Sequence, residues 1–359
     1  MTPGPPAWRN DGMPWLPCPM ECEPPTPAPA YVALDEESQV EALRGVALDA
    51  AGAFGLGVRD LQLVLHAFNT TFRLDTDDGR RLALRVNTNS KSTPANITAQ
   101  QAWLHALATE TEVLVPDPVA APGGQWEVSV HCPPWGGRLH ATLASWLDGD
   151  DVGECDEEQA HALGRTMAVL HDHAEGFSLP ARASLPLFDE PLFHDRNLLQ
   201  DASMLPQRDL EVVAEALAEC RRRFAQVDAG RRHIVLHADL HGGNLKWHRG
   251  RLAVFDLDDA GFGVPALDLA ISTFYLRGDA PAVEAALRAG YAEVRDLPDV
   301  SDAQFEALVA ARQLLLANSL LDSSTASLRA EATDYLALTV QRLRGWLSAG
   351  RFALDPQRR

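Results

Sequence analysis

The segment from residue 234 to residue 247, IVLHADLHGGNLKW, gathers the side chains most suited to chemistry. An apolar run gives way to His237, Asp239 and His241 at alternate positions, followed by two glycines and Asn244. One hypothesis is a metal site, because His233, His237 and His241 are spaced by four residues and would share one face of a helix. The apolar run and the glycines instead favour a strand followed by a loop, and no second group of His or Cys offers the remaining ligands for a transition metal.

A second hypothesis is a phosphate-transfer site. Asn244 precedes a short strand, a turn at Arg249–Gly250 reverses the chain, and the returning strand ends in Asp256 and Asp258. A hairpin would bring Asn244 and Asp256 face to face, with the oxygen ligands that Mg²⁺ prefers when it also holds nucleotide phosphates. Asp239 would lie close by, free to accept a proton from an attacking hydroxyl. Kinases use this combination of a catalytic Asp, an Asn and a metal-binding Asp.

The sequences HADLHGGNLKW and VFDLDDAGFGVPALDLA resemble the aminoglycoside phosphotransferase family, relatives of protein kinases that include choline and homoserine kinases. The family signature is H-x-D-x-x-x-x-N followed by an apolar strand that ends in Asp. His237, Asp239, Asn244 and Asp256 match it. The resemblance covers roughly residues 35–350 and includes the sequence DLA, whose Asp268 ties back to the catalytic loop in the family.

The resemblance implies a phosphotransferase that uses ATP and Mg²⁺. Asp239 would be the catalytic base or orienter, Asn244 and Asp256 would hold the metal, and His237 would brace the loop. Asp258 would support the metal or border the acceptor site.

Two further features of the loop are interpreted without a catalytic role. His241 has no fixed role in the family, so we interpret it as a packing or loop residue. Gly242 and Gly243 would give backbone room for a tight loop at the phosphates.

The rest of the chain predicts an α+β protein with the bilobal protein-kinase-like fold. Before residue 148, three β-rich runs with a DDGR turn, a helix at about 95–108 and another antiparallel pair predict a small antiparallel sheet with one helix. Seven of the eleven residues from 148 to 158 are acidic. Beyond them one hairpin lies among predicted helices at about 157–175, 208–228, 266–293, 302–320 and 327–348. We therefore predict a Pro-rich flexible tail at 1–33, a nucleotide-binding N-lobe at 34–147, and a helical C-lobe with the catalytic loop and acceptor site at 148–359.

By the same resemblance, the N-lobe supplies a cation for the nucleotide phosphates. In the strand LALRV this position falls on Arg85, which carries a positive charge and can fork onto two phosphate oxygens. Its helix partner is Gln100 where a Glu is expected. Gln100 could accept a hydrogen bond from Arg85 but adds no charge, which predicts a weaker clamp.

Other nucleotide contacts are expected in two connecting segments. The turn HAFNTTF would cover the phosphates with Asn69 and Thr70. The lobe connection ASWLDG would place the backbone of Trp146 and Leu147 beside the adenine edge.

The acceptor is left open by the sequence. The leading hypothesis is a hydroxyl of a small molecule, with an aminoglycoside as one candidate. The alternatives are a protein Ser/Thr kinase, a homoserine- or choline-type kinase, and a catalytically weakened nucleotide-binding regulatory protein, which Gln100 suggests. The acidic run could attract a cationic acceptor or be a solvated loop and helix start, and residues 184–197 form either a substrate loop or a packed insertion.

Composition narrows the partners. The net charge of −19 argues against nucleic acid, which needs a basic surface. No apolar run is long enough to cross a membrane, and the N-terminus lacks the basic start and apolar core of a signal peptide, so we expect a cytoplasmic protein. Cys18 and Cys22 form a C-x3-C pair in the Pro-rich tail without a second pair to complete a zinc site.

Overall fold

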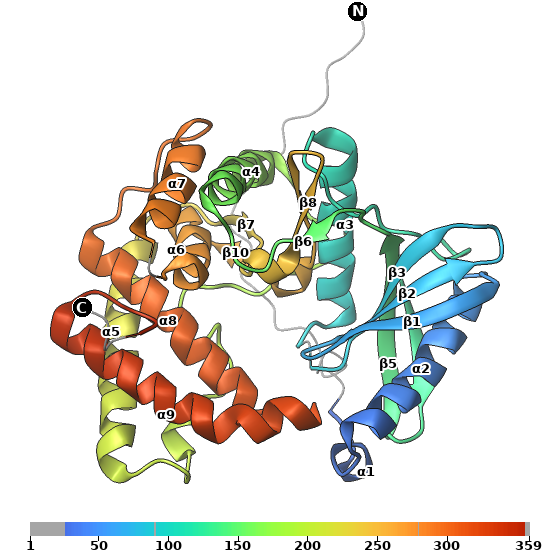
Figure 1. Ribbon diagram of the computed structural model, residues 1–359, viewed down its shortest axis with the longest axis horizontal. Helices are drawn as coiled ribbons and strands as arrows, with labels where there is room; N and C mark the ends of the chain where they lie inside the picture. The colour runs from blue at the N-terminus through green and yellow to red at the C-terminus, as the bar shows by residue number, and fades with distance from the viewer. Residues whose placement is uncertain (1–25, 90, 279, 356–359) are drawn as a thin grey trace, which may run out of the picture.

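The computed structural model describes residues 26–355, except residues 90 and 279. Its N-terminal lobe is built on a five-stranded antiparallel sheet with the order β1-β2-β3-β5-β4 (Figure 1). Along β3, Leu82, Leu84 and Val86 lie in a buried core beneath helix α2. Because side chains alternate across a strand, Arg85 lies on the opposite face of the sheet. The elements of this sheet and its helix are α2 (Glu36–Ala53), β1 (Val58–His66), β2 (Thr70–Thr76), β3 (Arg81–Val86), β4 (Glu127–Cys132) and β5 (Gly137–Ser145).

Part of the predicted tail is ordered against this lobe. Residues 29–32 form a single helical turn, α1 (Pro29–Val32), and Tyr31 is fully buried with its ring 4.7 Å from that of Trp135. The prediction of a flexible tail as far as residue 33 is therefore wrong for this turn, because a buried aromatic ring anchors it. Residues 1–25, with Cys18 and Cys22, lie outside the described part of the chain.

The N-lobe helix of the prediction is α3 (Pro94–Glu110), and it stands between the sheet and the C-lobe (Figure 1). A capping box formed by Thr93 and Asn96 starts it. Its buried side chains, including Trp103 and Leu107, join the hydrophobic core of the C-lobe, while α2 covers the other face of the sheet. The N-lobe therefore contributes a helix to the core of the C-lobe.

The C-lobe is mainly helical, as predicted, with one difference. The expected helix at 266–293 is broken into α6 and α7, because Pro281 cannot continue a helix and Arg277 turns inward. The Arg277 guanidinium is buried and pairs with Glu284 at 3.0 Å and Glu306 at 2.6 Å. The helices are α4 (Glu157–Gly176), α5 (Gln207–Asp228), α6 (Pro265–Leu276), α7 (Pro281–Ala292), α8 (Asp302–Leu321) and α9 (Ala326–Ala349). Within the described ranges, none of the helices combines the length and the apolar character that a bilayer crossing requires.

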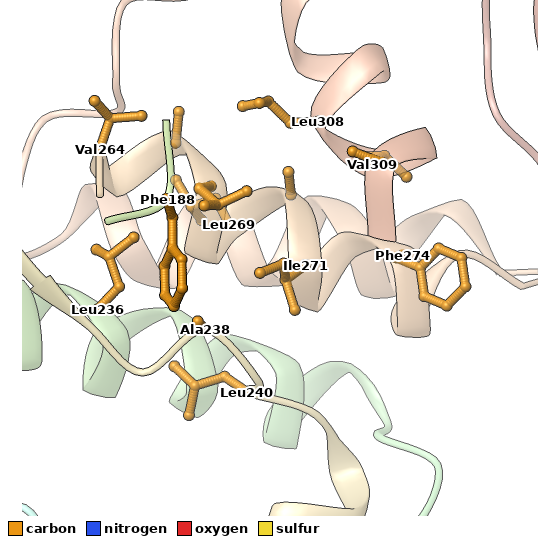
Figure 2. Close-up of a cluster of buried hydrophobic side chains, with 14 of the residues drawn as sticks. Phe188, Leu236, Ala238, Leu240, Val264, Leu269, Ile271, Phe274, Leu308 and Val309 are labelled. Atoms are coloured by element: carbon orange, nitrogen blue, oxygen red, sulfur yellow. The ribbon is translucent and has the colours of Figure 1, made fainter. Parts of the chain in front are cut away.

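Short strands in the C-lobe carry the segment singled out from the sequence. Strand β7 pairs antiparallel with β10, and a second small sheet has the order β6-β8-β9. Figure 2 shows Leu236, Ala238 and Leu240 within the apolar cluster that α6 and α8 also line. These three residues anchor the segment in the core, although β7 itself ends at Leu236 and the residues beyond it form a loop. The strands are β6 (Asp150–Asp151), β7 (Ile234–Leu236), β8 (Leu245–His248), β9 (Arg251–Val254) and β10 (Gly261–Gly263).

A second contact between the lobes lies at the junction of α8 and α9. Asn89, which follows β3, accepts from the Ser324 backbone N–H at 2.6 Å and donates to Thr325 Oγ1 at 2.8 Å. Thr325 in turn donates to the carbonyl of Ala67 at 2.6 Å, in the turn that was predicted to cover the phosphates. The lobes are thus joined at this junction as well as through the chain at residues 146–149.

Gly242 allows the catalytic loop to lie against the segment that leaves the lobe connection. A Cβ atom on Gly242 would lie 1.6 Å from the carbonyl oxygen of Gly153, and the Gly153 N–H donates to the Gly242 carbonyl at 3.2 Å. The absence of a side chain at Gly242 therefore allows the close backbone approach that this tight loop needs.

Gly242→Ala is therefore expected to destabilise the protein by about 1–3 kcal/mol, because two backbones would have to separate. Chemical denaturation of the purified variant measures this. Gly250→Ala is the matched control for loss of a glycine, because a Cβ atom at Gly250 would meet open space. The φ of +75° at Gly250 adds some backbone strain to this control. A variant at Gly242 as stable as the wild type would contradict the close approach.

Candidate active site

Asp268 shapes the backbone of the loop that carries Asp239. Its carboxylate accepts the backbone N–H of His237 at 3.1 Å and that of Ala238 at 2.7 Å, and it also contacts His171 Nε2 at 3.0 Å. Ala238 has a φ of +61°, a conformation that costs free energy for a residue with a Cβ and that the two bonds to Asp268 hold in place. The Asp at the start of α6 therefore ties back to the loop, as the resemblance implied.

His237 joins the loop to the β8–β9 hairpin. Its Nε2 donates to the carbonyl of Phe255 at 3.0 Å, and its Nδ1 accepts the backbone N–H of Asp239 at 3.3 Å. The Phe255 N–H donates to the Asn244 carbonyl at 3.1 Å, which closes the hairpin between the two predicted metal ligands. Since His237 is fully buried, its contacts are those of the bracing residue that the sequence suggested.

Asn244 lies against Asp239. Its Nδ2 donates to the Asp239 backbone carbonyl at 2.9 Å and to Asp239 Oδ2 at 3.0 Å. Both bonds use the amide nitrogen, so the amide oxygen faces away from Asp239. The orientation leaves this oxygen as the group that a cation could use.

Arg85 crosses from the sheet of the N-lobe to the end of the hairpin. Its Nη1 donates to Asp256 Oδ1, and its Nη2 lies 3.1 Å from Asp258 Oδ2. Burial alone would lower the pKa of the guanidinium, but the two carboxylates raise it above its ordinary range. The buried Nε of Arg85 makes no hydrogen bond within the described part of the chain, which leaves a donor for a further group in the cleft.

Asp256 ends the hairpin in a left-handed conformation, with a φ of +68°. A non-glycine residue in this region is uncommon, and such residues cluster at functional sites. The carboxylate is partly exposed and its charge is neutralised by Arg85.

The residues predicted in the phosphate-covering turn differ in their placement. Asn69 donates to Asp258 Oδ2 at 2.7 Å and accepts the Thr88 N–H at 2.9 Å, so it lies beside the carboxylates of the site. Thr70 does not: it is fully buried and its hydroxyl contacts His66 Nδ1 at 2.7 Å. The Thr70 hydroxyl is therefore engaged within the N-lobe, and a nucleotide contact from the backbone of this residue stays a prediction.

Gln100 is not the partner of Arg85 that the sequence predicted. Its Nε2 donates to the Asp258 backbone carbonyl at 2.6 Å and to Ser92 Oγ at 2.9 Å, and the side chain is buried. Arg85 pairs instead with carboxylates of the C-lobe. Gln100 thus fixes the segment that carries Asp258, a role that needs an N–H donor.

Gln100→Glu is accordingly expected to destabilise the protein by about 1–3 kcal/mol, because a carboxylate would meet the Asp258 carbonyl in a buried position. The free energy of unfolding from urea titration measures the effect. An increase in stability or in nucleotide affinity would support the original clamp hypothesis.

The lobe connection offers less than the sequence suggested. The Trp146 N–H donates to the Arg81 carbonyl at 3.3 Å, so this donor is already used within the protein. The Leu147 N–H makes no hydrogen bond within the described residues. Of the two predicted positions, the backbone of Leu147 retains a donor for an adenine edge.

Three residues that the sequence did not assign to the site also lie at Asp239. Arg312 of α8 donates to Asp239 Oδ1, the Tyr275 hydroxyl of α6 lies 3.5 Å from the same oxygen, and His241 Nε2 lies 3.4 Å from Oδ2. His241, interpreted above as a packing or loop residue, therefore adjoins the carboxylate of Asp239. Although burial tends to raise the pKa of Asp239, the Arg312 charge lowers it to about 2.

The acidic run and the 184–197 segment are largely structural. Asp156 caps α4 and the next two residues lie in its first turn, while Asp151 pairs with Lys246 at 2.6 Å. In the second segment Phe188 is buried, stacks on Phe193 at 3.9 Å and belongs to the C-lobe core. The alternatives of a solvated helix start and a packed insertion fit these contacts better than a substrate rim or loop.

The donors at the hairpin fit a cation that prefers oxygen. The Asn244 amide oxygen and the Asp256 carboxylate are hard ligands, and the Arg85 guanidinium already occupies a cationic position against Asp256. The transition-metal hypothesis lacks such a fit: the described residues contain no group of three or more His, Cys, Asp or Glu arranged around one point.

The chain has one lobe with an antiparallel sheet and one helical lobe. Asp239, Asn244 and Asp256 lie at a hairpin between them. These features define the protein-kinase-like class of phosphotransferases. The chain belongs to the phosphotransferase enzyme family of this class, whose sequence model matches residues 62–302. The family comprises ATP-dependent enzymes that transfer phosphate to a hydroxyl group.

Individual proteins are also similar to this chain in sequence. The chain is 31% identical over 272 residues to an uncharacterized protein of Deinococcus radiodurans, which covers 73% of this chain and 77% of that protein. It is 24% identical to the amicoumacin kinase of Bacillus subtilis (63% and 66%) and 28% identical to the serine/threonine protein kinase RdoA of Salmonella typhimurium (56% and 58%). The chain thus spans less than two thirds of these two kinases.

Solved structures share the fold. A microcompartment-associated aminopropanol kinase superposes with a TM-score of 0.72 at 23% identity, over 87% of this chain and all of that one. The amicoumacin kinase hAmiN, in complex with AMP-PNP, Ca²⁺ and Ami, superposes with a TM-score of 0.68 at 18% identity, over 86% and 96%.

Proposed function

We propose that this protein transfers the γ-phosphoryl group of ATP to a hydroxyl of an amine-bearing small molecule. The observation that carries the proposal is the convergence of Asp239, Asn244 and Asp256 at one hairpin, with Arg85 of the other lobe paired to Asp256. These are the groups that phosphoryl transfer requires: an acceptor of the hydroxyl proton, oxygen ligands for a cation, and a fixed positive charge at the phosphates.

Asp239 would orient the attacking hydroxyl. As the acceptor oxygen bonds to the γ-phosphorus, the bond from phosphorus to the bridging oxygen breaks and leaves ADP, and the hydroxyl proton passes to Asp239. The low pKa of Asp239 keeps it ionised and therefore ready to accept a hydrogen bond, although it makes the carboxylate a weak base. Orientation matters more than proton removal when the transition state is loose.

Asn244 and Asp256 would hold Mg²⁺, which when bound neutralises charge on the phosphate oxygens. Arg85 would then release Asp256 and turn its guanidinium, including the unpaired Nε, toward the phosphates. The N–H of Leu147 and the side chain of Asn69 would lie along the nucleotide.

An amine-bearing acceptor fits the charge of the molecule. The net charge of −19 attracts cations, and the relatives include kinases named for amicoumacin and aminopropanol. An aminoglycoside is one member of this acceptor class, and choline and homoserine are others.

A protein Ser/Thr kinase is the second candidate, because one relative carries that name. The regulatory alternative has less support, since its basis was the missing Glu at position 100, and Gln100 holds the Asp258 segment instead.

A phosphate-transfer screen with radiolabelled ATP separates these candidates. Aminoglycosides, amino alcohols, choline, homoserine, neutral sugars and a generic protein are offered in turn. Transfer to amine-bearing small molecules supports the proposal, transfer to protein alone supports the second candidate, and nucleotide binding without transfer supports a regulatory protein.

A further inference from the structure

The carboxylate of Asp239 has donors at both of its oxygens, and they come from different parts of the fold. Arg312 and Tyr275 of the C-lobe helices reach Oδ1, whereas Asn244 and His241 of the loop reach Oδ2. A carboxylate offers about four lone-pair positions. Because four donors already lie at Asp239, an acceptor hydroxyl can approach only where one of them gives way.

The contacts at Oδ1 are buried and mutually supported. The Arg312 side chain is 4% exposed and donates to Asp239 through Nη2. It also donates to the Tyr275 hydroxyl through Nε at 3.2 Å and Nη2 at 2.8 Å. The tyrosine oxygen therefore accepts from Arg312 and its own proton can point to Asp239. A buried charge pair held at several points is costly to break, so this side of the carboxylate is fixed.

The contact of His241 at Oδ2 is weaker and more accessible. Its Nδ1 accepts the Gly243 N–H at 3.0 Å, which assigns the proton of the neutral ring to Nε2, the atom 3.4 Å from Oδ2. That separation is long for a hydrogen bond. The ring stacks on Tyr275 at 4.3 Å, and the side chain is 24% exposed. The Tyr275 contact at 3.5 Å is no shorter, but two hydrogen bonds from Arg312 hold the Tyr275 hydroxyl in place. His241 has no hydrogen bond from Arg312, so of the four donors it is the one most readily displaced.

We propose that Arg312 and Tyr275 are positioning residues that hold Asp239 by Oδ1, so that Oδ2 receives the acceptor hydroxyl, which enters by displacing His241. This inference rests on the proposed function. It assigns different tasks to the two oxygens of one carboxylate. It also makes helix α8, which lies against α6, part of the catalytic apparatus (Figure 1).

Arg312→Met is expected to lower kcat on the order of 100-fold while the KM for MgATP changes by less than about threefold, because the carboxylate loses its orientation but the nucleotide contacts lie elsewhere. Arg312→Lys should recover about tenfold of that loss, since it restores one charged donor without the fork. Steady-state kinetics on the full chain, normalised to folded protein, measures both. An unchanged kcat in Arg312→Met, or no recovery in Arg312→Lys, would overturn the positioning role.

Arg277→Met is the matched control for loss of a buried arginine. Arg277 is 6% exposed, ends the same helix that carries Tyr275, and pairs with Glu284 and Glu306 away from Asp239. We expect it to lower Tm while kcat per folded molecule stays within about threefold of the wild type. Equal losses of kcat in the two methionine variants would mean that Arg312 acts only through stability.

His241→Phe tests the other oxygen. The variant keeps a ring on Tyr275 and removes the Nε2 proton, so the acceptor no longer has to displace a donor. Its acceptor KM should fall by about threefold or more. A fall in kcat as large as that of Arg312→Met would show that His241 is itself required, and would overturn the division between the oxygens.

A double-mutant cycle keeps this inference separate from the proposed function. Unfolding equilibria of Arg312→Met, Asp239→Asn and the double variant should show a coupling of at least about tenfold between the two sites, whether or not an acceptor is known. Coupling in a protein that transfers phosphate to nothing would refute the proposed function alone. Additive effects would refute the Arg312–Asp239 pair.

Discussion

Asp239→Asn is expected to lower the rate of phosphoryl transfer by a factor on the order of 10²–10⁴ and to leave MgATP binding nearly intact, because a neutral amide replaces the charged oxygen that orients the hydroxyl and receives its proton. The variant preserves size, and Asn244 and His237 still hold the loop to the hairpin. Single-turnover transfer and nucleotide titration measure the two effects separately.

Asp239 also pairs with Arg312, so the substitution leaves a buried guanidinium with one partner fewer. The rate must therefore be normalised to folded protein. Glu190→Gln, a partly buried carboxylate on the 184–197 segment, is a suitable control for the loss of one acidic side chain. Turnover by Asp239→Asn equal to that of the wild type would contradict the assignment of the base.

Mg²⁺ is expected to increase the affinity for ATP, and Asp256→Asn should reduce this increase by at least about tenfold. Mutating a residue that only hydrogen-bonds a metal ligand already costs about tenfold in metal affinity, so losing a ligand should cost at least as much. Affinity for ATP without metal should change far less, although the Arg85 contact is altered. Isothermal titration with and without Mg²⁺ resolves the two contributions. Asp258→Asn is the matched control, because Asp258 also pairs with Arg85 and lies two residues away.

The two variants, Asp256→Asn and Asp258→Asn, together test whether Asp256 alone is a metal ligand. If Asp256→Asn kept the full metal-dependent gain, the carboxylate would serve only as the partner of Arg85. If Asp258→Asn lost as much as Asp256→Asn, both carboxylates would belong to the metal site, which was one of the roles considered for Asp258 from the sequence.

The parts of the site that lie close together in the chain could be predicted from the sequence. Asp239, Asn244 and Asp256 are arranged by one strand, one tight loop and one hairpin, and the turn at Arg249–Gly250 sets their register.

The contacts between distant segments could not be predicted in this way. The family resemblance predicts that Gln100 pairs with Arg85, whereas the structure joins Arg85 to carboxylates of the other lobe. The position of Thr70 in the turn predicts a nucleotide contact, but its hydroxyl contacts His66, the residue opposite it on β1. Which face of an element a polar side chain uses depends on tertiary packing, which local pattern does not fix.

The position of Arg312 in the sequence indicates that its charge is paired. Arg312 is the one charged residue between Glu306 and Asp322, in a stretch whose other polar residues are Gln313, Asn318 and Ser319. A charge in such a place needs a buried partner. The sequence could have predicted that Arg312 is paired, but the partner is 73 residues away, and only the packing of α8 against α6 identifies it.

The central claim is that the Asp239, Asn244 and Asp256 site phosphorylates a hydroxyl of an amine-bearing small molecule. The most direct measurement is mass spectrometry of amine-bearing and neutral acceptors after incubation with the full chain, ATP and Mg²⁺, with Asp239→Asn in parallel. An amine-bearing acceptor is expected to gain one phosphoryl group with the wild type and to be phosphorylated far less with the variant. Phosphate transfer to protein or to neutral acceptors alone, or equal transfer by the variant, would contradict it.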